Sequence, residues 1–374
     1  MADPLAIAAA TVRDRIGDRA GGWDLAGVLP LPLLRELGAA GVLCAQLPEA
    51  FGGLGLSSLQ NGELTAATGR LCSSVRSVQT SQGMAAWTVQ RFGLPEQQRA
   101  WLPDLASGRL AAVGFSETGA GSDLAAMATT VRRSGDELVV DGHKRWMTAA
   151  RYADLLVVFG RYEDGAAAVL VPADAPGVHV EPVADPMGCR AAGHADVRLD
   201  GVRLPAGRLL GGSALPLPLL VTTALAYGRM SVAWGCVGIL RACLEAASRH
   251  AATREQFGQP IGRHQLVAGH LADLLVAEQV ATRVCEHASR CWDAGSAEQV
   301  IATVLAKQVA SEQAARAAAT AVQVLASAGA RDGGVAARAY RDAKLMEIIE
   351  GSSELCRLLL ADHALAVAPR GEEG

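Results

Sequence analysis

The carboxylate of Glu350 is the side chain whose place in the sequence best suits chemistry. It ends an apolar, helix-like run in LMEIIEGSSELCRLLL (residues 345–360), just before Gly351 and a second helical pattern. Lys344 is too far along a helix for an i, i+4 ion pair, and neither serine after Gly351 has a Glu or Gln three residues later to form a capping box. Glu354 does fit the first turn of the next helix, where a carboxylate suits the dipole. Apolar surroundings raise the pKa of a carboxyl, so Glu350 is predicted to be a base that removes a proton from carbon.

A polar, glycine-rich loop at GFSETGAGSDL (residues 114–124) could lie against a ligand. Leu124 stands where a Rossmann fingerprint needs its third glycine, and the Gly-Lys-Ser/Thr ending of a P-loop is absent, so neither nucleotide motif is present. Small residues and free backbone amides would still let the loop approach a flat ring or a phosphate and hydrogen-bond it. An ordinary surface turn explains the pattern about as well.

Two further stretches carry side chains that suit a cofactor. In HKRWMTAA, alternation puts Trp146 and Thr148 on one side of a strand, where they could cover one face of an aromatic ring. A tryptophan in the core of a barrel is the alternative. In ATREQFGQPIG, Arg254 lies in a break between two helices, where its guanidinium could clamp a diphosphate or simply be solvated.

The elements that must position these residues fall into three regions. Residues 1–112 have apolar residues at helical spacing, including a stretch from Leu64 to Phe92, and residues 113–212 consist of short apolar runs. The rest, residues 213–374, is rich in Ala and Leu, with helical patterns near 216–251, 262–292, 296–329 and 335–367. We therefore expect an α+β chain with an N-terminal helical domain, a middle antiparallel β-domain and a C-terminal four-helix bundle, these three regions being its domains.

Two local signals add detail to this expectation. Asp-Gly pairs at 141–142, 164–165 and 200–201 predict hairpin turns between strands. Gly329 predicts a C-terminal cap on the helix that contains Gln323.

Composition excludes several classes of function. The 374 residues are half apolar and carry a net charge of −4 without a basic cluster, which argues against nucleic-acid and membrane partners. No uninterrupted apolar run is long enough for a membrane span, and the first residues do not resemble a signal peptide, so a cytoplasmic location is expected. The eight cysteines form no CxxC pair and no HExxH occurs, which predicts buried free thiols and no metal site.

Taken together, these stretches resemble the acyl-CoA dehydrogenase family over nearly the whole chain and in the family's order. GFSETGAGSD is similar to the flavin-contacting loop, HKRWMTAA to the Lys-x-Trp-Ile-Thr strand, and TREQFGQPIGRHQ to the Arg-x-x-Phe-Gly turn with its following Gln. YRDAKLMEIIEGSSE is similar to the Arg-Asp-Ala-Lys…Glu-Gly-Thr signature. The resemblance implies an FAD enzyme that oxidises an acyl thioester.

The resemblance also implies roles for individual residues. Glu350 would remove the α-proton while the β-hydrogen leaves as hydride to flavin N5. Substrate would contact Ser122, Arg229 and Gly351. Residues of the inter-helix turn and Gln323 would reach the FAD of a neighbouring subunit in a homodimer or homotetramer. The residues that would hold FAD come from the loop, the strand, the inter-helix turn and the catalytic turn: Phe115, Ser116, Gly121, Ser122, Trp146, Met147, Thr148, Arg254, Gln256, Phe257, Gln265, Gln323, Ser352 and Glu354.

Departures from the family pattern carry information about the substrate. Glu-Gly-Ser replaces Glu-Gly-Thr, Thr118 stands where Pro is usual, and Ala326-Ser327 replaces a Gly-Gly pair in the cofactor turn. The segment LCSSVRSVQTSQGMAAW is polar, with Arg76 in its middle, whereas a long fatty acyl chain would require an apolar wall. These features resemble a branch of actinobacterial polyketide pathways whose members act on small acids held by an acyl carrier protein to make methoxymalonyl- or hydroxymalonyl-type extender units.

Other functions remain compatible with the same residues. A conventional short- or branched-chain acyl-CoA dehydrogenase is the second possibility, and a non-catalytic scaffold homologue is the third. The residues leave open the acyl group, the electron acceptor, and whether coenzyme A or a carrier protein holds the thioester, since both arms end in pantetheine.

Overall fold

The computed structural model describes residues 3–368, so residues 1–2 of the expected first domain and 369–374 of the expected last one lie outside the described residues. The N-terminal part is helical: α1 (Pro4–Ile16), α2 (Ala20–Ala26), α3 (Leu31–Ala39), α4 (Ser58–Leu71), α5 (Ser73–Phe92) and α6 (Pro95–Ala106). Capping chemistry accounts for two of the starts, because Asp3 accepts a hydrogen bond from the Leu5 amide and Ser57 forms a capping box with Gln60.

The predicted helical stretch from Leu64 to Phe92 is helical except at Cys72. It is two helices, α4 and α5, because Cys72 between them adopts an extended backbone (φ −154°, ψ 106°). The periodicity of apolar residues continues across this break and hides it from the sequence.

The middle of the chain forms one curled sheet. Its strands are β1 (Ala111–Gly114), β2 (Thr130–Ser134), β3 (Glu137–Met147), β4 (Leu155–Tyr162), β5 (Gly165–Pro172), β6 (Val178–Pro182) and β7 (Ala195–Pro205). The order is β1-β4-β2-β3-β7-β6, with β5 paired to β4. The sheet is therefore mostly antiparallel as expected, but β1 pairs with β4 in parallel and β2 meets β4 in parallel at Thr130 and Arg161, which corrects a purely antiparallel prediction.

Two of the three predicted Asp-Gly turns are wrong. Gly165 does pair with Tyr162 in the β4–β5 hairpin, as expected. Asp141-Gly142 lies inside β3 at a register shift, and Asp200-Gly201 lies inside β7. The positive φ of Gly201 serves an irregularity within a long strand, and such irregularities favour the same residues as hairpin turns.

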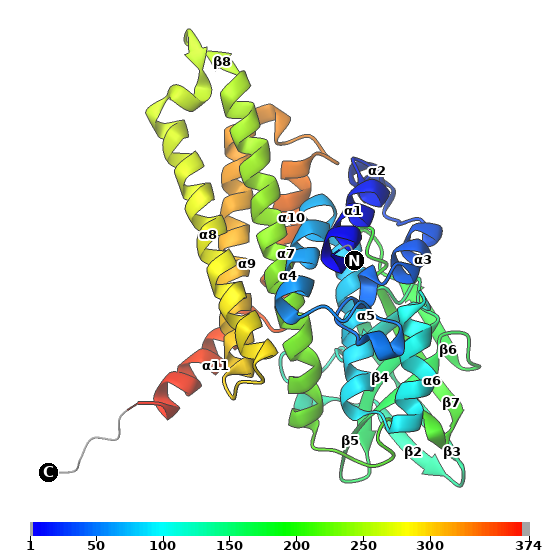
Figure 1. The fold of residues 1–374 in the computed structure, drawn as a ribbon. Helices are drawn as coiled ribbons and strands as arrows, with labels where there is room; N and C mark the ends of the chain where they lie inside the picture. Colours follow the sequence, from blue (N-terminus) through cyan, green and yellow to red (C-terminus); the bar gives the residue numbers. More distant parts are fainter. Residues whose placement is uncertain (1–2, 369–374) are drawn as a thin grey trace, which may run out of the picture.

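The C-terminal part is a bundle of long helices (Figure 1). It consists of α7 (Leu217–Thr253), α8 (Gln265–Asp293), α9 (Gln299–Leu325), α10 (Val335–Met346) and α11 (Ser353–Ala366), with a short hairpin, β8 (Glu255–Gln256) and β9 (Gln259–Pro260), at the outer tip of α7 and α8. Helix α7 packs against the N-terminal helices α4 and α5 on one side and α8, α9 and α10 on the other, so it joins the two helical parts. The expected order of helices, strands and helices is confirmed.

Helix α7 is long and apolar enough to cross a membrane by length and composition alone. In the structure, 78% of its most apolar window is buried by neighbouring elements, as in the central helix of a bundle. All eight cysteines are buried and unpaired, which confirms the expectation of free thiols.

The predicted cap at Gly329 is wrong, and the left-handed position lies three residues earlier. Helix α9 ends at Leu325, and Ala326 adopts φ 51° and ψ −130°, a conformation that only glycine adopts readily. Gly329 has an ordinary φ of −72°, and a Cβ there would lie 2.8 Å from the Val322 carbonyl oxygen. The lack of a side chain at Gly329 therefore lets its backbone pack closely against Val322.

Ala326→Gly should stabilise the protein because it relieves this strain. We expect the free energy of unfolding to rise by about 1 kcal/mol, measured by urea denaturation. Ala328→Gly, in the following turn of ordinary geometry, is the matched control and should not stabilise. A loss of stability in Ala326→Gly would contradict a strained backbone at this position.

Candidate active site

Glu350 lies in the turn between α10 and α11, where two successive residues adopt left-handed backbone. Its φ is 57° and that of Gly351 is 95°. The turn folds the carboxylate back against α7 at Gly228, where any Cβ would collide with Oε2 and with Met84 of α5. Ser352 then caps α11 by accepting a hydrogen bond from the Leu355 amide, and Glu354 lies exposed in the first turn, as expected.

One oxygen of the Glu350 carboxyl group is sealed from solvent. Oε2 is inaccessible and has no hydrogen-bond partner, although the residue as a whole is only half-buried. Burial raises the pKa of Glu350 to about 7, against the opposing charges of Arg229, Lys307 and Arg76. A carboxylate with a pKa near neutrality and a free lone pair can accept a proton, which is the role predicted for it.

Two buried cations hold the main chain of this turn. Lys307 of α9 is fully buried, and its Nζ donates to the carbonyl oxygens of Glu347 (3.2 Å) and Gly351 (2.5 Å). Arg229 of α7 donates from Nε to the Glu350 carbonyl oxygen at 3.1 Å. The structure therefore brings Arg229 and Gly351 to the base as expected, and it adds Lys307, which sequence reasoning missed.

Helix α5 connects this turn to the end of β3. Ser81 donates to the Thr148 carbonyl oxygen at 3.0 Å, and Met84, one helical turn further, packs at Gly228 beside Glu350. Because residues three apart lie on the same face of a helix, the base and the strand end that carries Trp146 and Thr148 pack against neighbouring positions of α5.

The end of β3 presents flat and polar groups that fit a heteroaromatic ring. Trp146 adopts φ 54° at a bulge, its side chain is 48% exposed, and its ring lies 5.7 Å from that of His194. Thr148 Oγ1 is 3.3 Å from His194 Nδ1, while His194 Nε2 is buried without a partner. Burial lowers the pKa of His194 to about 4, so the imidazole is neutral and can offer one donor or acceptor to a ligand. The alternative of a core tryptophan is wrong.

The side chains of two other predicted ligand residues at this end, Met147 and Phe115, face the protein interior and leave only their main chain for a ligand. The Met147 side chain is buried in the core of the sheet, against Gly114. The Phe115 ring stacks on Phe159 with centroids 4.2 Å apart, so it faces the protein interior. In the loop, Ser116 is half-buried, and Gly121 and Ser122 are exposed.

A buried ion pair braces the glycine-rich loop. Lys144 Nζ is fully buried and donates to Glu117 Oε1 at 2.6 Å and to the Phe115 carbonyl oxygen at 3.1 Å. Glu117 also accepts from the Ala128 amide and from Thr129. Burial alone would raise the pKa of Glu117, but the hydrogen bonds from Lys144 and Thr129 outweigh it and hold the pKa low. The loop is thus attached to β3, next to Trp146, and is not a free surface turn.

Lys144→Met should release this loop and lower cofactor retention. It leaves the Glu117 carboxylate buried without its cation, which typically costs about 3 kcal/mol. We expect urea unfolding to show this loss and the purified protein to retain markedly less FAD. Arg133→Met, an exposed change in β2 of the same sheet, is the control; equal stability and flavin content in both variants would contradict a bracing role.

A second group of predicted ligand residues lies far from the base within one chain. Arg254, Gln256 and Phe257 occupy the hairpin at the outer tip of the bundle, away from the sheet (Figure 1), and Phe257 is 93% exposed. Phe257 and Gly258 both have positive φ, which this two-residue turn requires. Two more members are also exposed: Gln265, which begins α8, and Gln323, near the end of α9. Within one chain, the hairpin residues therefore lie apart from the base and from the 114–124 loop.

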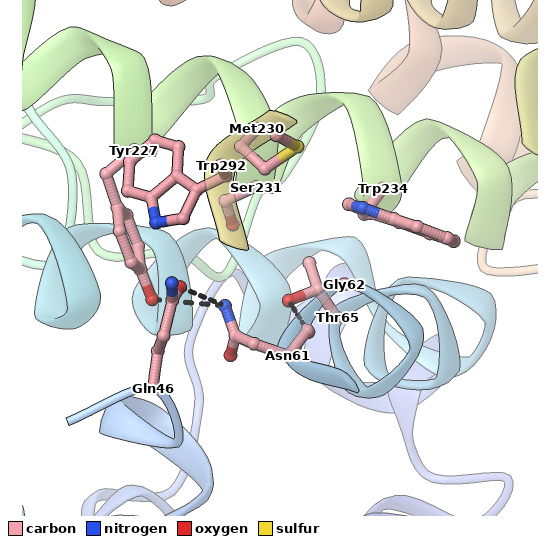
Figure 2. A pocket seen from close by; sticks show the side chains of 9 residues that line it. All are labelled: Gln46, Asn61, Gly62, Thr65, Tyr227, Met230, Ser231, Trp234 and Trp292. Atoms are coloured by element: carbon pink, nitrogen blue, oxygen red, sulfur yellow. Dashed lines mark hydrogen bonds between the residues drawn. The ribbon is translucent and has the colours of Figure 1, made fainter. Parts of the chain in front are cut away.

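Aromatic side chains fill the space between α5, α7 and α8. Gly83 is required because the Tyr227 ring lies against it, and Tyr227 joins Trp87 and Trp292 in an aromatic cluster with centroids 4.9–6.4 Å apart. What remains is a cavity of about 10 Å³, room for one water, between α4 and α7 (Figure 2). Its lining is mixed: Gln46, Asn61 and Thr65 face Tyr227 and Ser231 across it, and Met230, Trp234 and Trp292 complete it.

One set of potential metal ligands occurs near the end of α8. Ligand atoms of His287, Cys291 and Glu298 lie within 4.8 Å of one another, and the first and last of these residues are exposed. No buried polar group or charge in the described chain points to a cation there, so we assign no metal to it.

Sequence comparison places the whole chain among known proteins. Three family models match consecutive parts: "Acyl-CoA dehydrogenase, N-terminal domain" over residues 5–109, "middle domain" over 112–202 and "C-terminal domain" over 219–365. The probable acyl-CoA dehydrogenase YngJ of Bacillus subtilis (strain 168) is 35% identical over 350 residues, which cover 91% of this chain and 92% of YngJ. The mitochondrial short-chain specific acyl-CoA dehydrogenase of Homo sapiens is 31% identical over 349 residues, 91% of this chain and 84% of that one.

Solved structures include two similar proteins. FkbI, described as serving the biosynthesis of the methoxymalonyl extender unit of the Fk520 polyketide immunosuppressant, is 65% identical with a TM-score of 0.93, covering 96% of this chain and 99% of FkbI. Glutaryl-CoA dehydrogenase from Mycobacterium smegmatis is 32% identical with a TM-score of 0.92, covering 99% and 96%.

Proposed function

Because this chain belongs to the acyl-CoA dehydrogenase family of FAD-dependent oxidoreductases, we propose that it desaturates a small, polar acyl thioester held by an acyl carrier protein. The observation that carries this proposal is the wall of α5 beside Glu350, where Arg76, Thr80 and Ser81 are all buried. An enzyme for a long alkyl chain would need apolar side chains at these positions.

In the proposed reaction a carbon–carbon double bond forms between the α and β carbons of the acyl group. Glu350 accepts the α-proton on Oε2, and the buried site keeps water from competing for it. FAD, when bound, supplies the two-electron acceptor that takes the β-hydrogen as hydride. Lys307 and Arg229 hold the turn so that the carboxylate stays directed at the substrate rather than at solvent.

Residues of this chain and of a second copy would hold FAD together. The 114–124 loop, Trp146 and Thr148 would lie against the ring, with the His194 imidazole behind them, and Ser352 and Glu354 would approach it from the catalytic turn. The exposed hairpin with Arg254, Gln256 and Phe257, together with Gln265 and Gln323, would complete the cofactor site of a neighbouring subunit. A cofactor site shared between two subunits in this way requires a homodimer or a dimer of dimers.

The aromatic cluster of Trp87, Tyr227 and Trp292, which fills the space beside α7, supports a short acyl group. The 65% identity to FkbI supports a role in making a polyketide extender unit, with a carrier protein as the partner. A cytoplasmic location remains part of the proposal.

Flavin reduction by a panel of thioesters tests the proposal. The purified FAD-loaded protein is mixed without oxygen with glyceryl or hydroxyacyl groups on a carrier protein, and with butyryl-coenzyme A. We expect bleaching of the flavin by the polar carrier-bound group. Bleaching by butyryl-coenzyme A alone would identify a conventional short-chain dehydrogenase, and a protein that holds no flavin would contradict both enzymatic functions.

A further inference from the structure

Arg76 is a fully buried cation that has no anionic partner. It lies on α5 with 1% of its surface exposed, and among residues 3–368 no carboxylate oxygen lies within the 4.0 Å of an ion pair. Its recorded donations go to Thr80 Oγ1 at 3.2 Å and to Met346 Sδ at 3.0 Å, both neutral. A guanidinium has five N–H donors, and burying it without a counter-ion is costly unless a ligand uses it.

Arg76 and Glu350 lie along the same interface between α5 and α7. Three α5 residues at spacings of four define it: Arg76 packs on Gly235, Thr80 Oγ1 lies 2.7 Å from Ser231 Oγ, and Met84 packs at Gly228 beside Glu350. A Cβ at Gly235 would lie 2.8 Å from Cδ and Nε of Arg76, so this glycine makes room for the guanidinium just as Gly228 makes room for the carboxylate.

The charges of Arg76 and Glu350 also interact electrostatically. The positive charge of Arg76 lowers the pKa of Glu350 against the larger, opposite effect of burial. Met346, which accepts a hydrogen bond from Arg76, stands four residues before Glu350 on the same segment. An acyl group whose α-carbon faces Glu350 therefore has Arg76 within the same polar strip.

We propose that Arg76 is the specificity-determining residue of this site and that it binds an oxygen substituent, hydroxyl or carboxylate, of the acyl group. This inference rests on the proposed function and names the part of the substrate that the site selects. An oxygen acceptor satisfies the free donors of the guanidinium, whereas an alkyl group of equal size leaves them buried and unpaired. The site thus accepts oxygen-bearing acyl groups and rejects their apolar isosteres.

Arg76→Met tests this with three short thioesters, presented on one carrier protein and again on coenzyme A: 3-hydroxypropionyl and butyryl, which have chains of equal length, and succinyl, which adds a carboxylate. The readout is kcat/KM for flavin reduction, expressed as the ratio of each oxygen-bearing group to butyryl. The ratio is informative because any effect of Arg76 on the basicity of Glu350 changes all three rates equally and cancels. Comparison of 3-hydroxypropionyl with succinyl shows whether Arg76 binds a hydroxyl or a carboxylate of the acyl group.

We expect the wild-type protein to prefer at least one oxygen-bearing group, and Arg76→Met to lower that preference about 100-fold. Gly235→Ala should lower it in the same direction by displacing the guanidinium without removing its charge, and it decides the matter if Arg76→Met does not retain flavin. Arg70→Met, which removes an exposed arginine paired with Glu245, should leave the ratio unchanged.

The outcomes separate this inference from the proposed function. A wild-type preference for oxygen that survives in Arg76→Met and Gly235→Ala overturns the role of Arg76 and leaves the proposed function intact. An equal loss of rate by Arg76→Met on all three thioesters also overturns the specificity role of Arg76, because Arg76 would then act only through Glu350. A wild-type preference for butyryl overturns both.

Discussion

Replacing Glu350 with glutamine should leave FAD bound and slow its reduction by substrate about 1000-fold or more. The amide has nearly the shape of the carboxyl, so it fits against Gly228 and Met84 without a new collision, but it cannot accept the α-proton. Flavin absorbance of the purified variant measures cofactor retention, and anaerobic stopped-flow mixing with the thioester measures reduction.

The matched control is Glu347→Gln in the same turn. The Glu347 side chain pairs with Lys344 at 2.9 Å on the surface, so reduction should proceed at nearly the wild-type rate. Reduction of Glu350→Gln at the wild-type rate would show that another group is the base.

The same variant should also change how stability depends on pH. The pKa of Glu350 in the folded protein, about 7, lies above its usual value of 4.5. The wild-type protein therefore loses stability as the pH rises from the lower value through the higher one, because a buried carboxyl must ionise. Glutamine does not ionise, so the free energy of unfolding of the variant, relative to that of the wild type, should rise by a few kcal/mol (about 1.4 per pKa unit) between pH 5 and pH 8. A stability difference that does not vary with pH would contradict the raised pKa.

Lys307→Met should have the second largest effect. It removes the donor to the carbonyl oxygens of Glu347 and Gly351 and so loosens the turn that carries the base. The Glu347 carbonyl oxygen keeps a donor in the Ser353 amide at 2.9 Å, whereas the Gly351 carbonyl oxygen keeps only the weak thiol donor of Cys356. The poorly paired Gly351 carbonyl costs about 1–3 kcal/mol of stability, and a displacement of the base by about 1 Å lowers the rate of flavin reduction about 100-fold.

A pH profile separates this role from simple loss of structure. The charge of Lys307 lowers the pKa of Glu350, so its removal should move the acid limb of the rate profile to higher pH. Lys344→Met, which removes an exposed lysine near the same turn, should leave the profile in place. A lower rate with an unmoved acid limb would mean that Lys307 only supports the fold.

Much of the site could be predicted because its signals are local in the sequence. Glu350 stands out since no residue at helical spacing can pair with it or use it as a cap, and the structure shows Oε2 buried without a partner. The order of helices, strands and helices follows from the change in apolar periodicity near residues 112 and 213. The polarity of residues 72–81 is also readable in the sequence, and the structure shows Arg76, Thr80 and Ser81 of this stretch buried.

The rest depends on contacts between distant residues. Lys307 is 44 residues from Gly351, and Lys144 is 27 residues from Glu117, so no local pattern reveals either contact. His194 is 46 residues from Thr148 and gives no spacing signal. The misplaced turns at Asp141 and Asp200 have another cause: a strand irregularity and a hairpin use the same residue types, and only strand pairing distinguishes them.

The left-handed backbone at Glu350 lowers the stability of the fold at the same residue that is proposed to act as the base. An L-residue other than glycine, asparagine or aspartate is disfavoured at φ 57° by about 1 kcal/mol or more, and this one also buries an ionisable group. A glycine at position 350 would remove both penalties and the catalytic base together. Selection for thermal robustness alone would therefore favour inactive descendants of this enzyme, and a directed-evolution screen for stability would have to score turnover in the same round.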